Sequence, residues 1–412
     1  MRSRTLPVPA VFVALAAALV VAAGPLPAYA ATPVRCGGTV TTDLTLTANL
    51  SCRGDGLIVG ADGVTVNLNG HTISGSAAGT GIRAVGVAAP RIRNGVIRGF
   101  TIGVWLEATR DARLTGLQLL DNGGGTAFAP ASVYADQVSG LLIQGGRIVP
   151  RSGPPPTLAY AIRTAGAKGL VVRGVDVTGL TDLSSGSNAA QVVGNTFRYG
   201  GLNLSESHDA VVRRNSFLWA GINISECNRA QVLDNVLTSG RGIRSTFTDG
   251  TLIRGNLVRD TQYGVYTDVV THHLRVEGNT FDGNRYGVRA DVHVLGELDG
   301  LLVRNNRFTA NDQAGMFLEA DIIGTGPARV TISDNRFTRN GYASTDLDSA
   351  YRWIDDGLHT NVPVGSAVVV ARNLTSHNAE FGIEGSPVGS VRDGGGNVST
   401  GDPAGCIGVT CG

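Results

Sequence analysis

The chain has 412 residues, of which 58 are Gly and 15 are Pro, and 42% of the residues are apolar. Its formal net charge of +1 excludes the strongly basic field of a typical nucleic-acid-binding protein. Beyond the first thirty residues, no stretch is long and apolar enough to cross a membrane as a helix. We therefore expect a mature monomer with no nucleic-acid partner and no membrane insertion.

The N-terminus has the pattern of a secretory signal peptide. "MRSR" is positively charged, "VFVALAAALVVAAG" is apolar, and "AYA" ending at Ala30 is a small-residue cleavage site. Residues 1–30 hold two Arg and no acidic residue, so their removal would change the net charge to −1. We predict a secreted, extracellular protein that is cleaved after Ala30.

Five Cys residues are distributed as two close pairs at the ends and one isolated residue in the middle. In an exported chain this distribution predicts two disulfides, Cys36–Cys52 and Cys406–Cys411. Cys227 is then expected to be a reduced thiol near a turn.

A twenty-residue phrase occurs three times in succession over residues 189–248, as "AAQVVGNTFRYGGLNLSESH", "DAVVRRNSFLWAGINISECN" and "RAQVLDNVLTSGRGIRSTFT". The Asn at its seventh place recurs, with insertions only between phrases, at Asn195, Asn215, Asn235, Asn256, Asn279, Asn306, Asn335 and Asn373. Earlier segments keep the repeat but have Gly95 or Gly146 in place of the Asn, and Val175 in this place is an exception. Such a period indicates a repeat architecture.

Each phrase contains three short stretches of alternating apolar residues, for example "AVVRR", "SFLW" and "GINIS", which predict three strands separated by turns. If each phrase forms one coil, every strand pairs in parallel with its copy about 4.8 Å away, and stacking buries a continuous core. We expect the repeated Asn to adopt the left-handed conformation of a tight turn, with its amide in a ladder.

These repeats resemble the right-handed parallel β-helix of the pectin-lyase-like superfamily. The resemblance covers residues 57–392, about fourteen coils, and implies an all-β solenoid with an Asn ladder and disulfide-tied caps. The predicted organisation is a signal peptide (1–30), an N-terminal cap (31–56), the β-helix (57–392) and a C-terminal tail or cap (393–412). The resemblance also implies that the strand reached through a loop after the Asn turn forms a substrate cleft.

That strand has the pattern Gly, apolar, X, apolar, Z, in which X and Z should point outward. The X and Z positions carry Arg, aromatic and acidic residues, which suits an extended acidic polysaccharide because Arg binds carboxylate or sulfate through two hydrogen bonds. An ordinary exposed sheet face is the alternative. The predicted substrate-binding residues are Trp105, Tyr134, Arg163, Phe317 and His359.

Insertions at 291–300, 318–328 and 339–357 indicate where catalysis would be concentrated. The candidate catalytic residues beside them are Arg289, Asp268, Asp291, Glu319, Arg244, Tyr266 and His293. Three of these, Asp268, Asp291 and Glu319, are expected on successive coils. They would then share protons, bind Ca²⁺, or be balanced by Arg.

The favoured function is an exported lyase that acts on an extracellular acidic polysaccharide. A base (Arg289, Arg244, Tyr266 or His293) would remove the proton beside a uronate carboxylate while Ca²⁺ or Arg neutralises the charge. In a hydrolase, Asp268 and Glu319 would lie two coils apart, about 9.6 Å, near the inverting range.

Two non-catalytic alternatives stay open, of which the first is a carbohydrate-binding or adhesion β-helix. The second is metal delivery, as in periplasmic copper-loading β-helices, but Met1 and Met316 are the only Met residues, so soft-metal binding is disfavoured.

Overall fold

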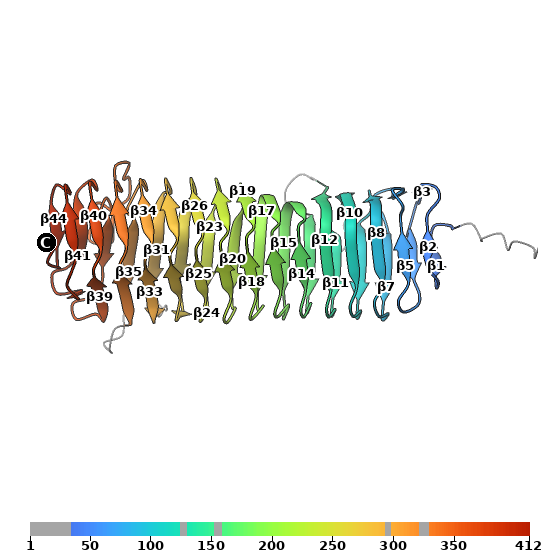
Figure 1. The fold of residues 1–412 in the computed structure, drawn as a ribbon, viewed down its shortest axis with the longest axis horizontal. Helices are drawn as coiled ribbons and strands as arrows, with labels where there is room; N and C mark the ends of the chain where they lie inside the picture. The colour runs from blue at the N-terminus through green and yellow to red at the C-terminus, as the bar shows by residue number, and fades with distance from the viewer. Residues whose placement is uncertain (1–33, 124–129, 152–158, 293–297, 321–328) are drawn as a thin grey trace, which may run out of the picture. The chain divides into compact units, whose positions relative to one another are not determined.

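The strands of this protein stack in parallel, coil upon coil, in chain order from the N-terminal to the C-terminal end of the solenoid (Figure 1). The computed structural model describes residues 34–123, 130–151, 159–292, 298–320 and 329–412. The predicted signal peptide and His293 lie outside the described residues. Within these described residues, one sheet of 41 strands winds through the coils, and a second has three strands. The predicted all-β, right-handed parallel β-helix is confirmed.

Three files of strands make up the coils. The first file, which carries the predicted cleft, consists of β1 (Gly38–Val40), β4 (Leu57–Val59), β7 (Thr80–Val85), β9 (Ile102–Glu107), β11 (Ala131–Asp136), β13 (Tyr160–Ala165), the second halves of β15 (Asp176–Ser184) and β17 (Thr196–Ser205), β20 (Gly221–Ser225), β23 (Gly242–Thr246), β27 (Tyr263–Asp268), β31 (Tyr286–Val292), β35 (Met316–Ala320), β38 (Leu358–Asn361), β41 (Phe381–Ser386) and β44 (Gly405–Ile407).

The second file, which precedes the Asn positions, consists of β2 (Leu44–Thr45), β5 (Thr65–Asn67), the first halves of β8 (Arg91–Arg98), β10 (Arg113–Asn122) and β12 (Leu142–Pro150), then β14 (Val171–Arg173), β16 (Gln191–Val193), β18 (Val211–Arg213), β21 (Gln231–Leu233), β25 (Leu252–Arg254), β29 (Arg275–Glu277), β33 (Leu301–Arg304), β36 (Val330–Ser333), β39 (Val368–Ala371) and β42 (Arg392–Asp393).

The third file follows the Asn positions and consists of β3 (Leu50–Ser51), β6 (Thr72–Ser74), the second halves of β8, β10 and β12, the first halves of β15 and β17, β19 (Ser216–Leu218), β22 (Val236–Thr238), β26 (Leu257–Arg259), β30 (Thr280–Asp282), β34 (Arg307–Thr309), β37 (Arg336–Thr338), β40 (Leu374–Ser376) and β43 (Val398–Thr400). Short strands β24 (Thr248–Asp249), β28 (Thr271–His272) and β32 (Leu298–Asp299) form the second sheet.

The core fills the inside of the coils with stacked copies of the same residue. Phe197 and Phe217 occupy equivalent places and stack with ring centroids 4.7 Å apart. Phe308 and Phe337 repeat this contact at 4.6 Å. Strand β20 shows the underlying pattern, because buried and partly exposed residues alternate along it.

The predicted Asn ladder is present and fully buried. The oxygen Oδ1 of Asn235 accepts hydrogen bonds from the backbone N (2.9 Å) and Nδ2 (3.0 Å) of Asn215. Its own Nδ2 donates to the carbonyl oxygen of Val212 (2.9 Å) and to Oδ1 of Asn256 (3.0 Å). Each ladder residue therefore satisfies backbone groups that the turn would otherwise bury without partners.

The left-handed residue of this turn is not the Asn itself, which corrects the prediction. Positive φ angles occur one place earlier, at Gly194 (64°), Arg214 (54°) and Asp334 (58°). The Asn follows that residue and points inward because its amide has buried backbone partners. Val175, the exception to the repeat, ends the ladder, and its backbone N donates to Oδ1 of Asn195 (3.0 Å).

A second ladder runs parallel to the first and was not predicted. Each of its members lies five residues after a member of the first ladder. The nitrogen Nδ2 of each Asn donates to an oxygen of the next member, as Asn311 does to Asn340 (2.8 Å), and the ladder ends on the carboxylate of Asp402. Its members are Asn284, Asn311, Asn340, Asn378 and Asp402.

The cysteine predictions are confirmed. Disulfides join Cys36 to Cys52 and Cys406 to Cys411, and Cys227 is a buried free thiol. Parallel pairing continues into both predicted caps, because β1 pairs with β4 and β44 pairs with β41. Among the described residues no helix could span a membrane.

We predict that Asn235→Ala lowers the free energy of unfolding by about 2 kcal/mol, because it leaves buried backbone groups of the neighbouring coils unpaired. Urea unfolding followed by circular dichroism would measure the loss. The control is Val236→Thr at the next, exposed position, where we expect a change below about 0.5 kcal/mol. Equal effects of the two substitutions would contradict a stabilising ladder.

Candidate functional site

The outward X positions of the first file stack in register, as the sequence pattern predicts. Tyr266 lies opposite Arg289 on the next coil, and Arg289 lies opposite Phe317. The complete stack is Arg83, Trp105, Tyr134, Arg163, Asp182, Asn203, Asn223, Arg244, Tyr266, Arg289, Phe317, His359 and Glu384.

Asp182 belongs to this stack although the sequence pattern did not include it. It lies between Arg163 and Asn203 in the register. The polar Thr181 occupies an inward place where the pattern requires an apolar residue, so the segment was not recognised. Nδ2 of Asn203 donates to Oδ1 of Asp182 (2.6 Å), and Nδ2 of Asn223 donates to Oδ1 of Asn203 (2.6 Å). The stack here is a chain of aligned amides.

The N-terminal part of the stack is held together by ring contacts. The guanidinium of Arg83 lies over the Trp105 ring at 5.0 Å, and Trp105 meets Tyr134 edge to face at 5.6 Å. Arg163 lies over Tyr160 at 4.8 Å. Trp105, Tyr134 and Arg163 are all partly exposed. Their position on neighbouring coils agrees with the predicted stripe, and their contact with a substrate stays a prediction.

A groove forms in the middle of this face because the coils change length there. Four residue steps separate the left-handed Trp219 from Asn223, five separate Ser239 from Arg244, and six separate Asp260 from Tyr266. The strands stay in register, so the extra residues bulge outward at the turn. The turns of the longer coils therefore extend further from the solenoid axis than those of the shorter coils.

The groove has a volume of about 520 Å³. Gly200, Gly221 and Gly242 line it together with Asn203 and Asn223 from the amide chain. The remaining lining residues are Leu180, Leu202, Ile222, Arg241, Arg244, Gln262, Tyr263 and Tyr266. A cation, amides and phenol rings thus converge in one depression, which is the arrangement expected of a polar ligand site.

Arg244, Tyr266 and Asp268 form a connected group at the groove wall. Nη2 of Arg244 donates to Oδ2 of Asp268 (2.8 Å), and its guanidinium lies 5.7 Å from the Tyr266 ring centroid. Tyr263 stacks on Tyr266 at 4.8 Å. Burial, followed by the negative charge of Asp268 and a hydrogen bond to it, raises the pKa of Tyr266 to about 12.

Arg289 is held as a cation on the next coil. Its Nη2 donates to Oδ2 of Asp291 (2.5 Å), and its guanidinium lies between the rings of Tyr286 (4.9 Å) and Phe317 (5.5 Å). Burial lowers the pKa of Arg289, but the hydrogen bond to Asp291 outweighs it and the net shift is upward. Such a group suits charge neutralisation better than proton abstraction.

Two residues predicted to contact substrate are buried instead. Phe317 is 1% exposed and His359 is 0% exposed. The insertion 339–357 folds over them, and its Ile354 packs with Phe317 and Tyr286 in one cluster. The insertion was expected to border an open stripe. Because it covers the stripe at these coils, neither side chain is available to a ligand in this structure.

The insertion is attached through its carboxylates. Asp346 accepts hydrogen bonds from Arg285 (2.6 Å) and from the hydroxyl of Tyr286. Asp348 accepts from Nη2 of Arg352 (2.5 Å). The stacked carboxylate Glu319 is buried below, where it accepts from the backbone N of Ser349 (2.9 Å). Asp346 thus accepts from donors on the coils, Asp348 pairs within the insertion, and Glu319 of the coils accepts from the backbone of the insertion.

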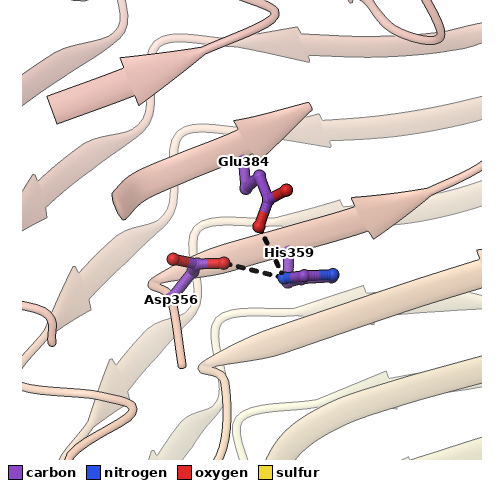
Figure 2. Close-up of side chains that lie close together, drawn as sticks. All are labelled: Asp356, His359 and Glu384. Atoms are coloured by element: carbon purple, nitrogen blue, oxygen red, sulfur yellow. Dashed lines mark hydrogen bonds and ion pairs between the residues drawn. The ribbon is translucent and has the colours of Figure 1, made fainter. Parts of the chain in front are cut away.

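The imidazole of His359 is surrounded by carboxylates (Figure 2). Its Nδ1 lies 2.7 Å from Oδ2 of Asp356 and 3.0 Å from Oε2 of Glu384. Its Nε2 lies 3.2 Å from Oδ2 of Asp348. Both ring nitrogens therefore face acceptors, which is the pattern of a doubly protonated imidazolium.

The pKa shifts of this cluster agree with a buried ionic network. Burial would lower the pKa of His359, but hydrogen bonds to Asp348, Asp356 and Glu384 raise it well above its usual value. Burial raises the pKa of Asp356 to about 7. Burial also opposes ionisation of Asp348 and Glu384, yet hydrogen bonds to His359 hold both pKa values below their usual range.

Ligand atoms that converge within 4.8 Å of one another occur, among the described residues, in the groups Asp356–His359–Glu384 and Asp355–Asp356–Glu380. In the first group, both ring nitrogens of His359 already contact carboxylates. We therefore interpret this group as a salt-bridge network. The predicted calcium ligands Asp268, Asp291 and Glu319 lie on successive coils in register. Calcium binding there stays a prediction.

We predict that His359→Gln destabilises the protein most between about pH 4.5 and 6.5. The pKa of His359 is raised on folding, so its contribution is complete below about 6.5 and is lost as the pH rises through its folded value. The lowered pKa values of Asp348 and Glu384 give contributions present above about 4 and lost in acid.

Near pH 6 we expect a loss of about 3 kcal/mol, because the substitution removes the imidazolium that Asp348, Asp356 and Glu384 share in a buried network. Urea unfolding at several pH values between 4 and 9 would measure it, with His377→Gln at an exposed histidine as the control. A loss that stays constant across this range would contradict the ionic role of His359.

Comparisons with known proteins give a partial family match. A family model described as periplasmic copper-binding protein (NosD) matches residues 160–356, just under half of the chain. No curated protein matches. A mutant of the periplasmic alginate epimerase AlgG is 12% identical, over 80% of this chain and 76% of that chain, with a TM-score of 0.43.

Two further solved structures show the same level of similarity. The alginate lyase AlyF-OU02 is 10% identical over 89% of this chain and 79% of that chain (TM-score 0.38). A mutant tailspike protein of E. coli bacteriophage HK620, in complex with a hexasaccharide, is 10% identical over 90% and 73% (TM-score 0.37). The coil of three parallel strands and the internal Asn ladder show that this chain has the right-handed parallel β-helix fold.

Proposed function

We propose that this protein is exported and cleaves an extracellular acidic polysaccharide by β-elimination in the groove between Asn203 and Tyr266. The proposal rests on one observation. Arg244, the amides of Asn203 and Asn223, and the phenol of Tyr266 all line the same groove. The two terminal disulfides support export, because such bonds persist in oxidising compartments.

Arg244 supplies the charge that the first step needs. Its guanidinium is about half exposed (52%) while Asp268 holds one edge, so its other donors reach a uronate carboxylate. Neutralising that carboxylate stabilises the carbanion that forms when the adjacent carbon loses its proton. The amides of Asn203 and Asn223 extend along the floor and offer hydrogen bonds to hydroxyl groups.

Tyr266 supplies the proton transfer. In a syn elimination one group takes the proton from the carbon beside the carboxylate and returns it to the leaving oxygen. The carbon–oxygen bond breaks, a carbon–carbon double bond forms, and Tyr266 ends in its starting state. Since its pKa is raised to about 12, the free protein holds Tyr266 mostly neutral, and the reactive tyrosinate becomes more abundant as the pH rises.

The carboxylates Asp268 and Glu319 support hydrolysis less well than the groove supports elimination. Hydrolysis needs two acidic groups beside the scissile bond. Oδ2 of Asp268 is engaged by Arg244, and Glu319 is 6% exposed beneath the insertion. Neither carboxylate therefore faces the groove as an open acid or base, which favours elimination.

Copper binding, which the description of the matching family names, is not part of the function proposed for this chain. Soft thiol and thioether ligands select copper(I). The free thiol Cys227 is buried in the described structure, and so is Met316. Nδ1 of His273 lies 2.8 Å from Oδ1 of Asp249 and is therefore already paired.

We predict that the mature protein releases unsaturated uronate products, seen as new ultraviolet absorbance, from at least one polymer in a panel of polyuronides and glycosaminoglycans. Arg244→Ala should lower kcat/KM about 100-fold or more by removing a charge that stabilises the transition state. Arg229→Ala changes an exposed arginine outside the groove and should leave the rate unchanged. New reducing ends without absorbance would indicate hydrolysis, and binding without products would indicate adhesion.

We also predict that kcat/KM rises about tenfold per pH unit from pH 7 to 10, because the fraction of ionised Tyr266 grows in this way below its pKa. Tyr266→Phe should abolish the activity, whereas Tyr342→Phe, at an exposed tyrosine outside the groove, should retain the wild-type profile. A bell-shaped profile centred in acid would contradict Tyr266 as the proton-transfer group.

A further inference from the structure

Two large aromatic side chains are exposed on successive coils, next to residues that line the groove. Tyr199 is 67% exposed and Trp219 is 59% exposed. They are equivalent residues on successive coils. Tyr199 directly follows Arg198, Trp219 directly follows Leu218, and Arg198 and Leu218 are partners in the strand register. The spacing of parallel coils therefore places the backbones of these two residues about 4.8 Å apart along the solenoid.

Packing does not account for these two rings. Both residues have left-handed φ angles, 54° for Tyr199 and 55° for Trp219, a conformation that bulky residues rarely adopt. The next two coils carry Ser239 and Asp260 in the same place, with φ of 57° and 54°. The turn is therefore satisfied by small polar residues, and the aromatic side chains bury little surface in exchange for the strain.

Both rings adjoin residues of the groove. Gly200 follows Tyr199 directly and lines the groove, and Gly221 lies two residues after Trp219 and lines it as well. Neighbouring turn residues are small, since Gly200, Ala220 and Gly240 come next after the left-handed residue on three successive coils. On the two coils that carry the rings, the turn residues between each ring and the groove floor, Gly200, Ala220 and Gly221, are therefore small.

We propose that Tyr199 and Trp219 form a stacking subsite for a pyranose ring of the polysaccharide, at the point where the chain leaves the groove. Rigid aromatic rings with a polar edge give contact area at low entropic cost and suit the apolar face of a sugar. A protein partner fits less well, because a stable interface buries roughly 1,000 Å² or more, whereas this patch consists of two side chains among Ser and Asp turns.

The subsite rests on the proposed function in naming an acidic polysaccharide as its ligand, but it makes a separate claim about which residues bind. Its test is affinity electrophoresis in gels that contain alginate, polygalacturonate or hyaluronan. The test variant combines Tyr199→Ser and Trp219→Ser, which introduces the residue that the next coil carries at Ser239 and so keeps the turn. The matched control is Trp353→Ser, at a tryptophan that is also exposed (53%) but lies on the insertion.

For any polymer that retards the wild-type protein, we expect the Kd of the double variant to rise about tenfold, with no change for Trp353→Ser. A short oligosaccharide of the same polymer, which fills only the groove, should bind both proteins equally. Thermal unfolding followed by circular dichroism should show that the double variant is folded.

The outcomes separate the two claims. Unchanged retardation of the folded double variant would overturn the subsite and leave the groove function standing. Weakened binding without elimination by the wild type would support the subsite and contradict the lyase. Retardation by none of the three polymers would overturn the subsite together with its ligand class.

Discussion

The in-register stacking of side chains inside the coils is the constraint on which every other feature depends. A ladder residue such as Asn235 bonds to the coil below and to the coil above, so every coil must present the same residue at the same place. Stacked rings such as Phe308 and Phe337 obey the same rule. With the interior periodic in this way, variation is confined to the turns and to the outward faces.

The groove is a consequence of that confinement. Its floor and wall differ by one or two residues in the turns after Trp219, Ser239 and Asp260, while the strands that follow remain aligned. A small change in turn length thus creates a depression without disturbing the core. It also brings Arg244 and Tyr266 together at the wall, where partial burial and the charge of Asp268 alter the acidity of the phenol.

The insertion 339–357 shows the cost of covering such a face. Burying charged groups is unfavourable unless each has a partner, and the insertion satisfies this requirement by pairing Asp346 with Arg285 and Asp348 with Arg352 and His359. The aromatic residue beneath it, Phe317, then joins an apolar cluster. A stretch of the outward stack becomes a second small core, whereas the groove several coils earlier remains open.

The coil, the ladder and the outward stack except Asp182 could be predicted from the sequence, because a twenty-residue period with two-residue alternation indicates which side chains face inward. Both disulfides followed from the close Cys pairs at the two ends. It also contained the second ladder, five residues after the first, although this spacing was not recognised. The tertiary structure was needed to show that the insertion covers Phe317 and His359, and that Tyr199 and Trp219 are exposed beside a groove. The physical reason is that exposure of an outward residue depends on how turns and insertions from other coils fold over it, and periodicity carries no record of that.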